Sequence, residues 1–188
     1  MTSLAAIVLA AGASTRMGEP KQLLTFRGKR LVEHVASEAL AASFEPVVVV
    51  LGAEAEQVKP SLVALPVVVV ENADWASGMG SSISAGMKAL PECDGVAILL
   101  ADQPLVTTAH LREMRGSFCG DIVAARYNDR VSVPAIFPKR LFGTLAALRG
   151  HEGARSILRD PDEQVVAFDL PEAAMDVDTP GDWAALTR

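Results

Sequence analysis

The sequence has few cysteines, little basic charge and no long apolar segment. Its two cysteines, Cys93 and Cys119, stand far apart among 188 residues, with no Cys-x-x-Cys pair and no histidine pair nearby. They are expected to be reduced thiols of a cytoplasmic protein, because disulfide frameworks and zinc sites need more closely patterned ligands. The longest apolar runs, such as residues 4–11, fall far short of the roughly 18 residues that a membrane-spanning helix needs.

The amino-terminal apolar run resembles the core of a signal peptide, because small residues follow it. However, residues 1–3 carry no charged side chain, and the run leads directly into a charged, patterned loop. A signal peptide has a basic segment before its apolar core. We therefore expect residues 5–10 to form a buried first strand.

The charge balance is acidic, with 17 Lys and Arg against 23 Asp and Glu, for a net charge of -6. This balance argues against a nucleic-acid partner, and no stretch concentrates basic residues for a membrane surface. Apolar residues make up 50% of the chain, which excludes a disordered protein. The length suits one domain over residues 1–188.

Short apolar runs alternate with segments of helical spacing, such as residues 31–40 and 111–115. The pattern predicts an α/β protein with a three-layer, mostly parallel sheet that is buried on both faces. The expected strands cover residues 5–10, 46–51, 67–71, 95–100, 122–126 and 164–169. A further strand over residues 133–137 contains Pro134, which predicts an edge or a sheet boundary. Short helices are expected over residues 139–148 and 154–159.

Ligands of such sheets bind beyond the carboxyl ends of the strands, so the loops there are informative. The first loop, residues 9–21, consists of small residues with two cations, Arg16 and Lys21, a plan that suits a polyphosphate. A P-loop is excluded because Gly12 and Gly18 enclose five residues and Glu19 follows. The dinucleotide fingerprint is also missing. The alternative is a tight turn whose cations are solvated.

Carboxylates follow two further expected elements. Asp102 comes two residues after the end of the strand over residues 95–100 and could hold Mg²⁺ together with substrate phosphates and water. Asp176 and Asp178 could complete this metal site. Each has a structural alternative: Asp102 could cap a turn before Pro104, and Asp178 or Thr179 could cap a final helix.

The loop over residues 71–82 contains Gly78 and Gly80, which allow close backbone approach, and Ser81 or Ser82 could cap the next helix. Of the three histidines, His34 and His110 are expected on the surface of helices. His151 lies between glycines and is the more informative one. No histidine has the spacing of a zinc helix.

Four segments together resemble the molybdenum cofactor nucleotidyltransferases: residues 9–18 with Lys21, residues 72–86, residues 100–104 and residues 176–180. The resemblance covers nearly the whole chain and implies the nucleotide-diphospho transferase (Rossmann-like) fold. The Leu-Ala-Ala-Gly sequence at residues 9–12 is similar to the cytidylyl form of the family, since guanylyl enzymes carry Leu-Ala-Gly-Gly.

The resemblance implies a nucleotide site and a magnesium site. CTP would bind at Leu9, Ala10, Ala11, Gly12, Arg16, Lys21, Gly78, Ser82 and Gly86. Lys21 would neutralise the α-phosphoryl group and Arg16 would hold the leaving pyrophosphate. Asp102, with Asp176 or Asp178, would ligate Mg²⁺.

The resemblance also implies an acceptor site at Pro134, His151 and Arg155, where this chain departs from the family pattern. The family's Gly-Asp-x-Gly-Ala-Arg is Gly-His-Glu-Gly-Ala-Arg at residues 150–155, and its frequent His-Pro is Val-Pro at residues 133–134. The expected reaction transfers CMP from CTP to the terminal phosphate of molybdopterin and releases pyrophosphate, with a molybdoenzyme as a possible partner. The alternatives are a sugar or polyol phosphate as acceptor, or a non-catalytic protein that hands cofactor to a molybdenum hydroxylase. A dehydrogenase is disfavoured by the missing fingerprint.

Overall fold

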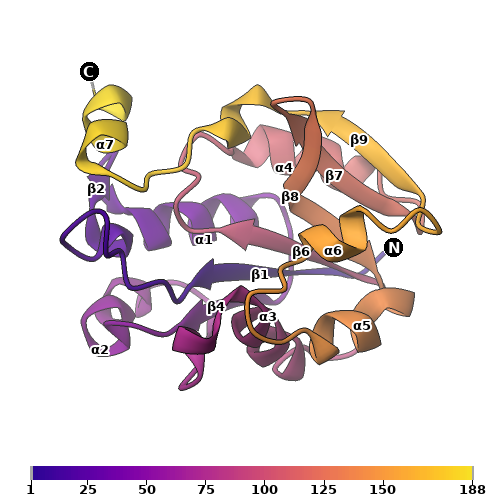
Figure 1. Ribbon diagram of the computed structural model, residues 1–188, viewed down its shortest axis with the longest axis horizontal. Coiled ribbons are helices and arrows are strands. Elements are labelled where there is room, and N and C mark those ends of the chain that lie inside the picture. Colours follow the sequence, from indigo (N-terminus) through magenta and orange to yellow (C-terminus); the bar gives the residue numbers. More distant parts are fainter. Residues whose placement is uncertain (1, 188) are drawn as a thin grey trace.

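A seven-stranded sheet runs through the computed structural model, which describes residues 2–187 (Figure 1). Its strands lie in the order β5-β4-β1-β6-β8-β7-β9, where β8 is antiparallel to both neighbours and every other pair is parallel. The strands are β1 (Leu4–Ala10), β4 (Val47–Leu51), β5 (Val68–Glu71), β6 (Gly95–Leu100), β7 (Ile122–Tyr127), β8 (Arg130–Pro138) and β9 (Val165–Asp169). The predicted α/β class and mostly parallel sheet are confirmed.

Helices cover both faces of the sheet, because alternate residues of β1 point to opposite sides. Ala6 and Val8 pack with α1 (Leu31–Ala41), α2 (Ala55–Val58) and α4 (Thr108–Gly116) on one face. Ile7 and Leu9 pack with α3 (Met79–Lys88), α5 (Phe142–Ala147) and α6 (Arg155–Leu158) on the other. The expected burial on both faces is right for β1 and β4 and wrong for β5 and β9, which are partly exposed because they are the sheet edges.

The strand that contains Pro134 lies inside the sheet, between β6 and β7, so the edge prediction was wrong. Its register with β7 jumps from Ala135 to Ser132, which leaves Val133 and Pro134 in a bulge. A bulge tolerates a residue without an N–H group, which explains how proline occupies a central strand. The pairing of β6 with β8 ends at Ile98 and Ala135. Leu99 and Leu100 therefore pair with β1 and not with β8.

The carboxyl-terminal segment folds back onto the first loop. Phe26 of the small hairpin β2 (Thr25–Phe26) and β3 (Lys29–Arg30) belongs to one apolar cluster with Met17, Val177 and Trp183. Trp183 lies on α7 (Pro180–Leu186), which Figure 1 shows beside β2. Thr179 caps α7 by accepting a hydrogen bond from the Asp182 N–H, with Pro180 at the first helical position. Of the two residues proposed as the cap, Thr179 is the one observed.

Five short 3₁₀ helices complete the chain: η1 (Lys21–Leu23), η2 (Lys59–Leu62), η3 (Trp75–Ser77), η4 (Lys139–Leu141) and η5 (Pro171–Ala174), counted over residues 2–187. His34 is buried, contrary to the surface prediction, and its Nε2 donates to the Pro104 carbonyl at 3.0 Å. His110 is half-buried beside the Thr107 cap of α4. Cys93 is a buried free thiol and Cys119 an exposed one. Within residues 2–187, no helix is long and apolar enough to cross a membrane.

Candidate functional site

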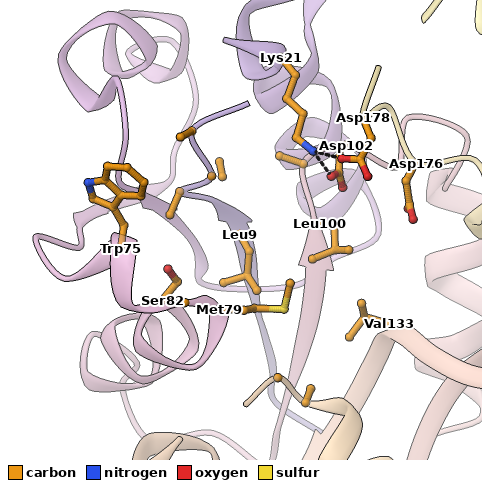
Figure 2. A pocket seen from close by; sticks show the side chains of 18 of the residues that line it. Leu9, Lys21, Trp75, Met79, Ser82, Leu100, Asp102, Val133, Asp176 and Asp178 are labelled. Carbon is orange, nitrogen blue, oxygen red and sulfur yellow. Dashed lines mark hydrogen bonds and ion pairs between the residues drawn. The ribbon is translucent and has the colours of Figure 1, made fainter. Parts of the chain in front are cut away.

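A cavity of about 700 Å³ opens at the carboxyl ends of β1 and β6. Most of the predicted site residues line it: Leu9, Ala10, Ala11, Gly12, Arg16, Lys21, Gly78, Ser82, Asp102, Asp176, Asp178, His151 and Arg155. Figure 2 shows Trp75 and Ser82 on one side of this cavity and the three aspartates on the other. Segments far apart in the sequence therefore meet at one site, as the position of the loops predicts.

Two predicted residues do not line the cavity. Gly86 lies in α3 against the sheet, where an added Cβ would stand 2.8 Å from Ile7 Cγ2 and 3.1 Å from Val50 Cγ2. This glycine lets the helix pack closely on the strands, so its expected contact with the nucleotide was wrong. Pro134 is buried in the bulge of β8, and its neighbours Ser132 and Val133 reach the cavity instead.

Lys21 lies between two carboxylates (Figure 2). Its Nζ is 2.5 Å from Asp102 Oδ2 and 2.7 Å from Asp178 Oδ1, and Arg16 Nη2 is 2.8 Å from Asp178 Oδ2. Burial alone would lower the pKa of Lys21, but Asp102 and Asp178 outweigh it and raise that pKa. Burial likewise opposes ionisation of Asp178, yet Lys21 and Arg16 bring its pKa below the usual value. Lys21 and Asp178 are therefore both charged at neutral pH.

Asp176 is the carboxylate of this group that forms no ion pair with any cation among residues 2–187. Burial, and then the charge of Asp102, raise its pKa to about 6. Among residues 2–187, Asp176 Oδ1 and Asp102 Oδ1 are buried oxygens without a hydrogen-bond partner. Buried polar atoms of this kind call for a ligand or a water molecule.

The residues present fit a divalent cation of the magnesium type. Over the described part of the chain, no three His, Cys, Asp or Glu side chains gather as a ligand group, so the three aspartates do not form a complete cage. Mg²⁺ needs only one or two carboxylates, because it keeps water and binds substrate phosphates. The unpartnered oxygens of Asp102 and Asp176 provide that donor set.

The segment that carries Asp176 and Asp178 is fastened to the loop after β6. Val177 N donates to the Asp102 carbonyl at 2.9 Å. The buried side chain of Gln103 donates through Nε2 to the Ala173 carbonyl at 2.8 Å. These bonds hold the carboxyl-terminal aspartates beside Asp102 although more than 70 residues separate them in the sequence.

Sequence reasoning missed Gln22, which holds the first loop from within. This residue is 2% exposed, and its Nε2 donates to the Ala10 carbonyl at 3.0 Å and to the Gly12 carbonyl at 2.8 Å. Ser14 Oγ donates to Gln22 Oε1 at 3.2 Å and accepts from Lys21 N at 3.1 Å. The only available signal was a glutamine directly after the candidate lysine, and its burial could not be read from a loop sequence.

Asn72 organises the loop on the opposite side of the cavity. Its Nδ2 donates to Ser81 Oγ at 2.8 Å and to Ser82 Oγ at 3.0 Å. Gly78 is the cap residue of α3, so neither serine has the capping role that was expected. An added Cβ on Gly78 would stand 2.3 Å from the Gly150 carbonyl oxygen. The close approach predicted for this glycine is therefore confirmed, and its neighbour is the loop that carries His151.

The third wall of the cavity comes from β7, β8 and the loop before α6. Tyr127, Ser132 and Val133 line this wall, and the Tyr127 hydroxyl donates to the Val133 carbonyl at 3.2 Å. His151 and Arg155 line it from exposed positions. The wall offers apolar surface, a hydroxyl and a cation beside the three aspartates, which suits a large anionic molecule.

Comparisons with known proteins identify relatives of this chain. A family model described as a MobA-like NTP transferase domain matches residues 6–166. Nicotine blue oxidoreductase of Paenarthrobacter nicotinovorans is 36% identical over 185 residues, which cover 92% of this chain and 91% of that protein. The purine catabolism protein PucB of Bacillus subtilis is 28% identical, covering 98% of this chain and 96% of its own length.

Solved structures with the same fold match nearly the whole chain. Rv0371c from Mycobacterium tuberculosis superposes with a TM-score of 0.85 at 31% identity, covering 98% of this chain and 97% of its own. The same protein in complex with manganese superposes with a TM-score of 0.79 at 32% identity, covering 98% of each chain.

Proposed function

The chain belongs to the MobA-like NTP transferase family, and from this premise we propose that it transfers CMP from CTP to the terminal phosphate of molybdopterin, releasing pyrophosphate in the cytoplasm. The observation that carries the proposal is the cluster of Lys21, Asp102 and Asp178 at the rim of the cavity. Such a cluster provides a cation for phosphate and carboxylates for a metal ion. The Ala-Ala-Gly sequence at residues 10–12 supports cytosine as the base.

The reaction needs charge neutralisation and positioning more than acid–base chemistry. An oxygen of the acceptor phosphate, already anionic at neutral pH, attacks the α-phosphorus of CTP in line. The bond from that phosphorus to the bridging oxygen breaks, and pyrophosphate leaves. Lys21 neutralises charge at the α-phosphoryl group, and Arg16, which is 70% exposed at its side chain, holds the pyrophosphate as a planar donor.

Asp102, with Asp176 or Asp178, would hold Mg²⁺, which supplies neutralisation of the phosphate charge when it is bound. The manganese complex of the relative Rv0371c supports a divalent metal in this family. Two of these carboxylates, Asp102 and Asp178, fix the resting position of Lys21 and Arg16. Both cations therefore have to exchange a carboxylate partner for a phosphate partner when the nucleotide binds.

The acceptor would lie against the third wall of the cavity. Ser132 and Val133 give it a mixed polar and apolar surface, and Arg155 gives a cation for a phosphate. A tricyclic pterin with one terminal phosphate has the matching chemistry. His151, which stands where the family pattern has an aspartate, faces the same part of the cavity. A sugar or polyol phosphate is the alternative occupant of this wall.

The experiment measures pyrophosphate release with each nucleoside triphosphate, Mg²⁺ and molybdopterin. Wild type is compared with Asp102→Asn, which keeps the shape of the side chain, and with Glu113→Gln on exposed α4 as the matched control. We expect turnover with CTP in wild type and control, and a loss of at least ~100-fold in Asp102→Asn. Preference for GTP, or unchanged turnover in Asp102→Asn, contradicts the proposal. Binding of CTP without release of pyrophosphate favours the alternative that the protein is non-catalytic and hands cofactor to a molybdenum hydroxylase.

A second candidate function follows from the relative named nicotine blue oxidoreductase, which matches this chain over nearly its full length. Its name places it in another reaction class. The first loop here has no dinucleotide fingerprint, which weighs against NAD(P)H chemistry at this site. Oxidation of NADH or NADPH by an aromatic electron acceptor, followed by the loss of the absorbance of the reduced nicotinamide, tests this candidate directly. Turnover in that assay, with no pyrophosphate release, would replace the transferase proposal.

A further inference from the structure

The Gln22 amide determines which atoms of the first loop can face a ligand. Its two N–H groups occupy the carbonyl oxygens of Ala10 and Gly12. The carbonyl oxygen between them, on Ala11, accepts from Ala53 N at 3.1 Å. Three consecutive carbonyl oxygens of this cavity wall are thus turned into the protein.

The N–H groups of the same wall remain available. Within residues 2–187, no protein acceptor receives the N–H of Gly12 or of Ala13, and both residues line the cavity. The carbonyl oxygens of residues 10–12 are therefore all occupied, while the N–H groups of Gly12 and Ala13 can donate to a ligand. A Cβ added to Gly12 would meet nothing within 4 Å, so a ligand can approach the backbone closely there.

We infer that Gln22 is a positioning residue for base selection: by holding the carbonyl oxygens inward, it makes the loop select a base edge with adjacent acceptor atoms. Cytosine presents O2 and N3 as acceptors, whereas uracil and guanine present a ring N–H at the corresponding position. The inference rests on the proposed nucleotide site and goes beyond it, because it assigns the choice of base to a buried side chain.

The orientation of the Gln22 amide is itself fixed. Its Oε1 accepts from Ser14 Oγ, and the Ser14 oxygen accepts from the backbone N–H of Lys21. The hydrogen bond from Ser14 Oγ to Gln22 Oε1 thereby keeps Nε2 directed at the carbonyl oxygens of Ala10 and Gly12. Removing that hydroxyl frees the amide to rotate, which gives a milder test than removing the amide.

The test measures the affinities for CTP and UTP by titration calorimetry, without acceptor, in wild type, Gln22→Met, Ser14→Ala and the control Gln57→Met. Gln57 is an exposed glutamine on α2. In Gln22→Met the carbonyls of Ala10 and Gly12 lose their donors and can turn toward the ligand. We expect the CTP preference over UTP to fall about tenfold, the effect of roughly one net hydrogen bond. The control keeps the wild-type preference.

Kinetics separate positioning from catalysis. Where turnover is present, Gln22→Met raises KM for CTP and leaves kcat within about threefold, because Lys21 and Asp102 remain in place. Equal affinity of wild type for CTP and UTP, or an unchanged preference in folded Gln22→Met, overturns the inference. If Gln22→Met does not fold, Ser14→Ala decides, and an unchanged preference in that variant overturns it. A CTP preference that depends on Gln22, without pyrophosphate release, retains the inference and rejects the proposed transfer.

Discussion

Gly12, within the first loop, and Gly52, which packs against Ala11 of that loop, should respond in opposite ways to an added methyl group. A Cβ on Gly12 would meet nothing within 4 Å and would project into the space of the cavity. A Cβ on Gly52 would stand 2.5 Å from Trp75 Cβ and 2.6 Å from the Ala11 carbonyl oxygen. Neither glycine has the left-handed backbone conformation that excludes alanine. Comparing the two substitutions therefore distinguishes open space that a ligand could fill, at Gly12, from space that protein atoms already fill, at Gly52.

The magnitudes follow from these contacts. Gly12→Ala should stabilise the free protein by about 0.4–1 kcal/mol, because alanine restricts the unfolded chain. In the complex the methyl group intrudes on the nucleotide, and overpacking of about 1–3 kcal/mol weakens binding by about 5- to 150-fold. Gly52→Ala should cost the free protein about 1–3 kcal/mol, which lowers Tm by about 2–12 °C for a chain of this size.

The assay combines thermal unfolding with CTP titration for both variants. Gly12→Ala is expected to unfold at or above the wild-type Tm and to bind CTP weakly. Gly52→Ala is expected to unfold at a lower Tm than wild type. Its affinity for CTP should fall only to the extent that the added methyl group displaces the first loop. Wild-type affinity in a stable Gly12→Ala would refute the placement of the base against residues 10–12. A loss of stability in that variant would show that the space at Gly12 is not free.

The remaining predictions concern the charged cluster. Lys21→Met should abolish turnover and strengthen Mn²⁺ binding, because the ammonium group no longer competes for Asp102 and Asp178. The control is Lys88→Met, at an exposed lysine. Unchanged or weaker Mn²⁺ affinity of Lys21→Met would contradict this prediction. Arg16→Ala should leave Tm unchanged, because its ion pair is exposed, and should raise KM for CTP; a shifted Tm with normal KM would assign it a structural role. Asp176 has its pKa raised to about 6, so the wild-type fold takes up a proton and gains stability as pH falls from about 6 towards the unfolded value. In EDTA, Asp176→Asn should therefore be more stable than wild type at pH ~7.5 and lose this advantage by pH ~4.5; a difference independent of pH would exclude that titration.

The sequence allowed most of the sheet to be predicted, because its strands are uninterrupted apolar runs that only a buried sheet accommodates. Two kinds of position could not be read in this way. The valines of β5 are as apolar as those of β4, and only the strand order makes β5 an edge. Pro134 signals an edge locally, and the bulge that admits it to a central strand depends on the register with β7.

The candidate site divides in the same manner. Arg16, Lys21 and Asp102 could be proposed because they lie in the loops that follow buried strands, and the structure brings them to one cavity. Gln22 was missed because its function lies in burial, which a loop sequence does not reveal. Gly86 was assigned to the nucleotide site from the family resemblance, because the sequence alone does not show that Ile7 packs against this glycine of α3.

The charged cluster at the site carries a net negative charge of its own, as the whole chain does. Arg16 and Lys21 face Asp102, Asp176 and Asp178, so with every group ionised the carboxylates exceed the cations by one charge. In that state the cluster repels a triphosphate. A divalent cation held by these carboxylates would reverse the sign of the excess, and Lys21 would then be free to exchange the two carboxylates that it bridges for phosphate oxygens. Under the proposed function, nucleotide and metal should therefore bind interdependently, each raising the affinity for the other, since linkage requires the coupling to be reciprocal.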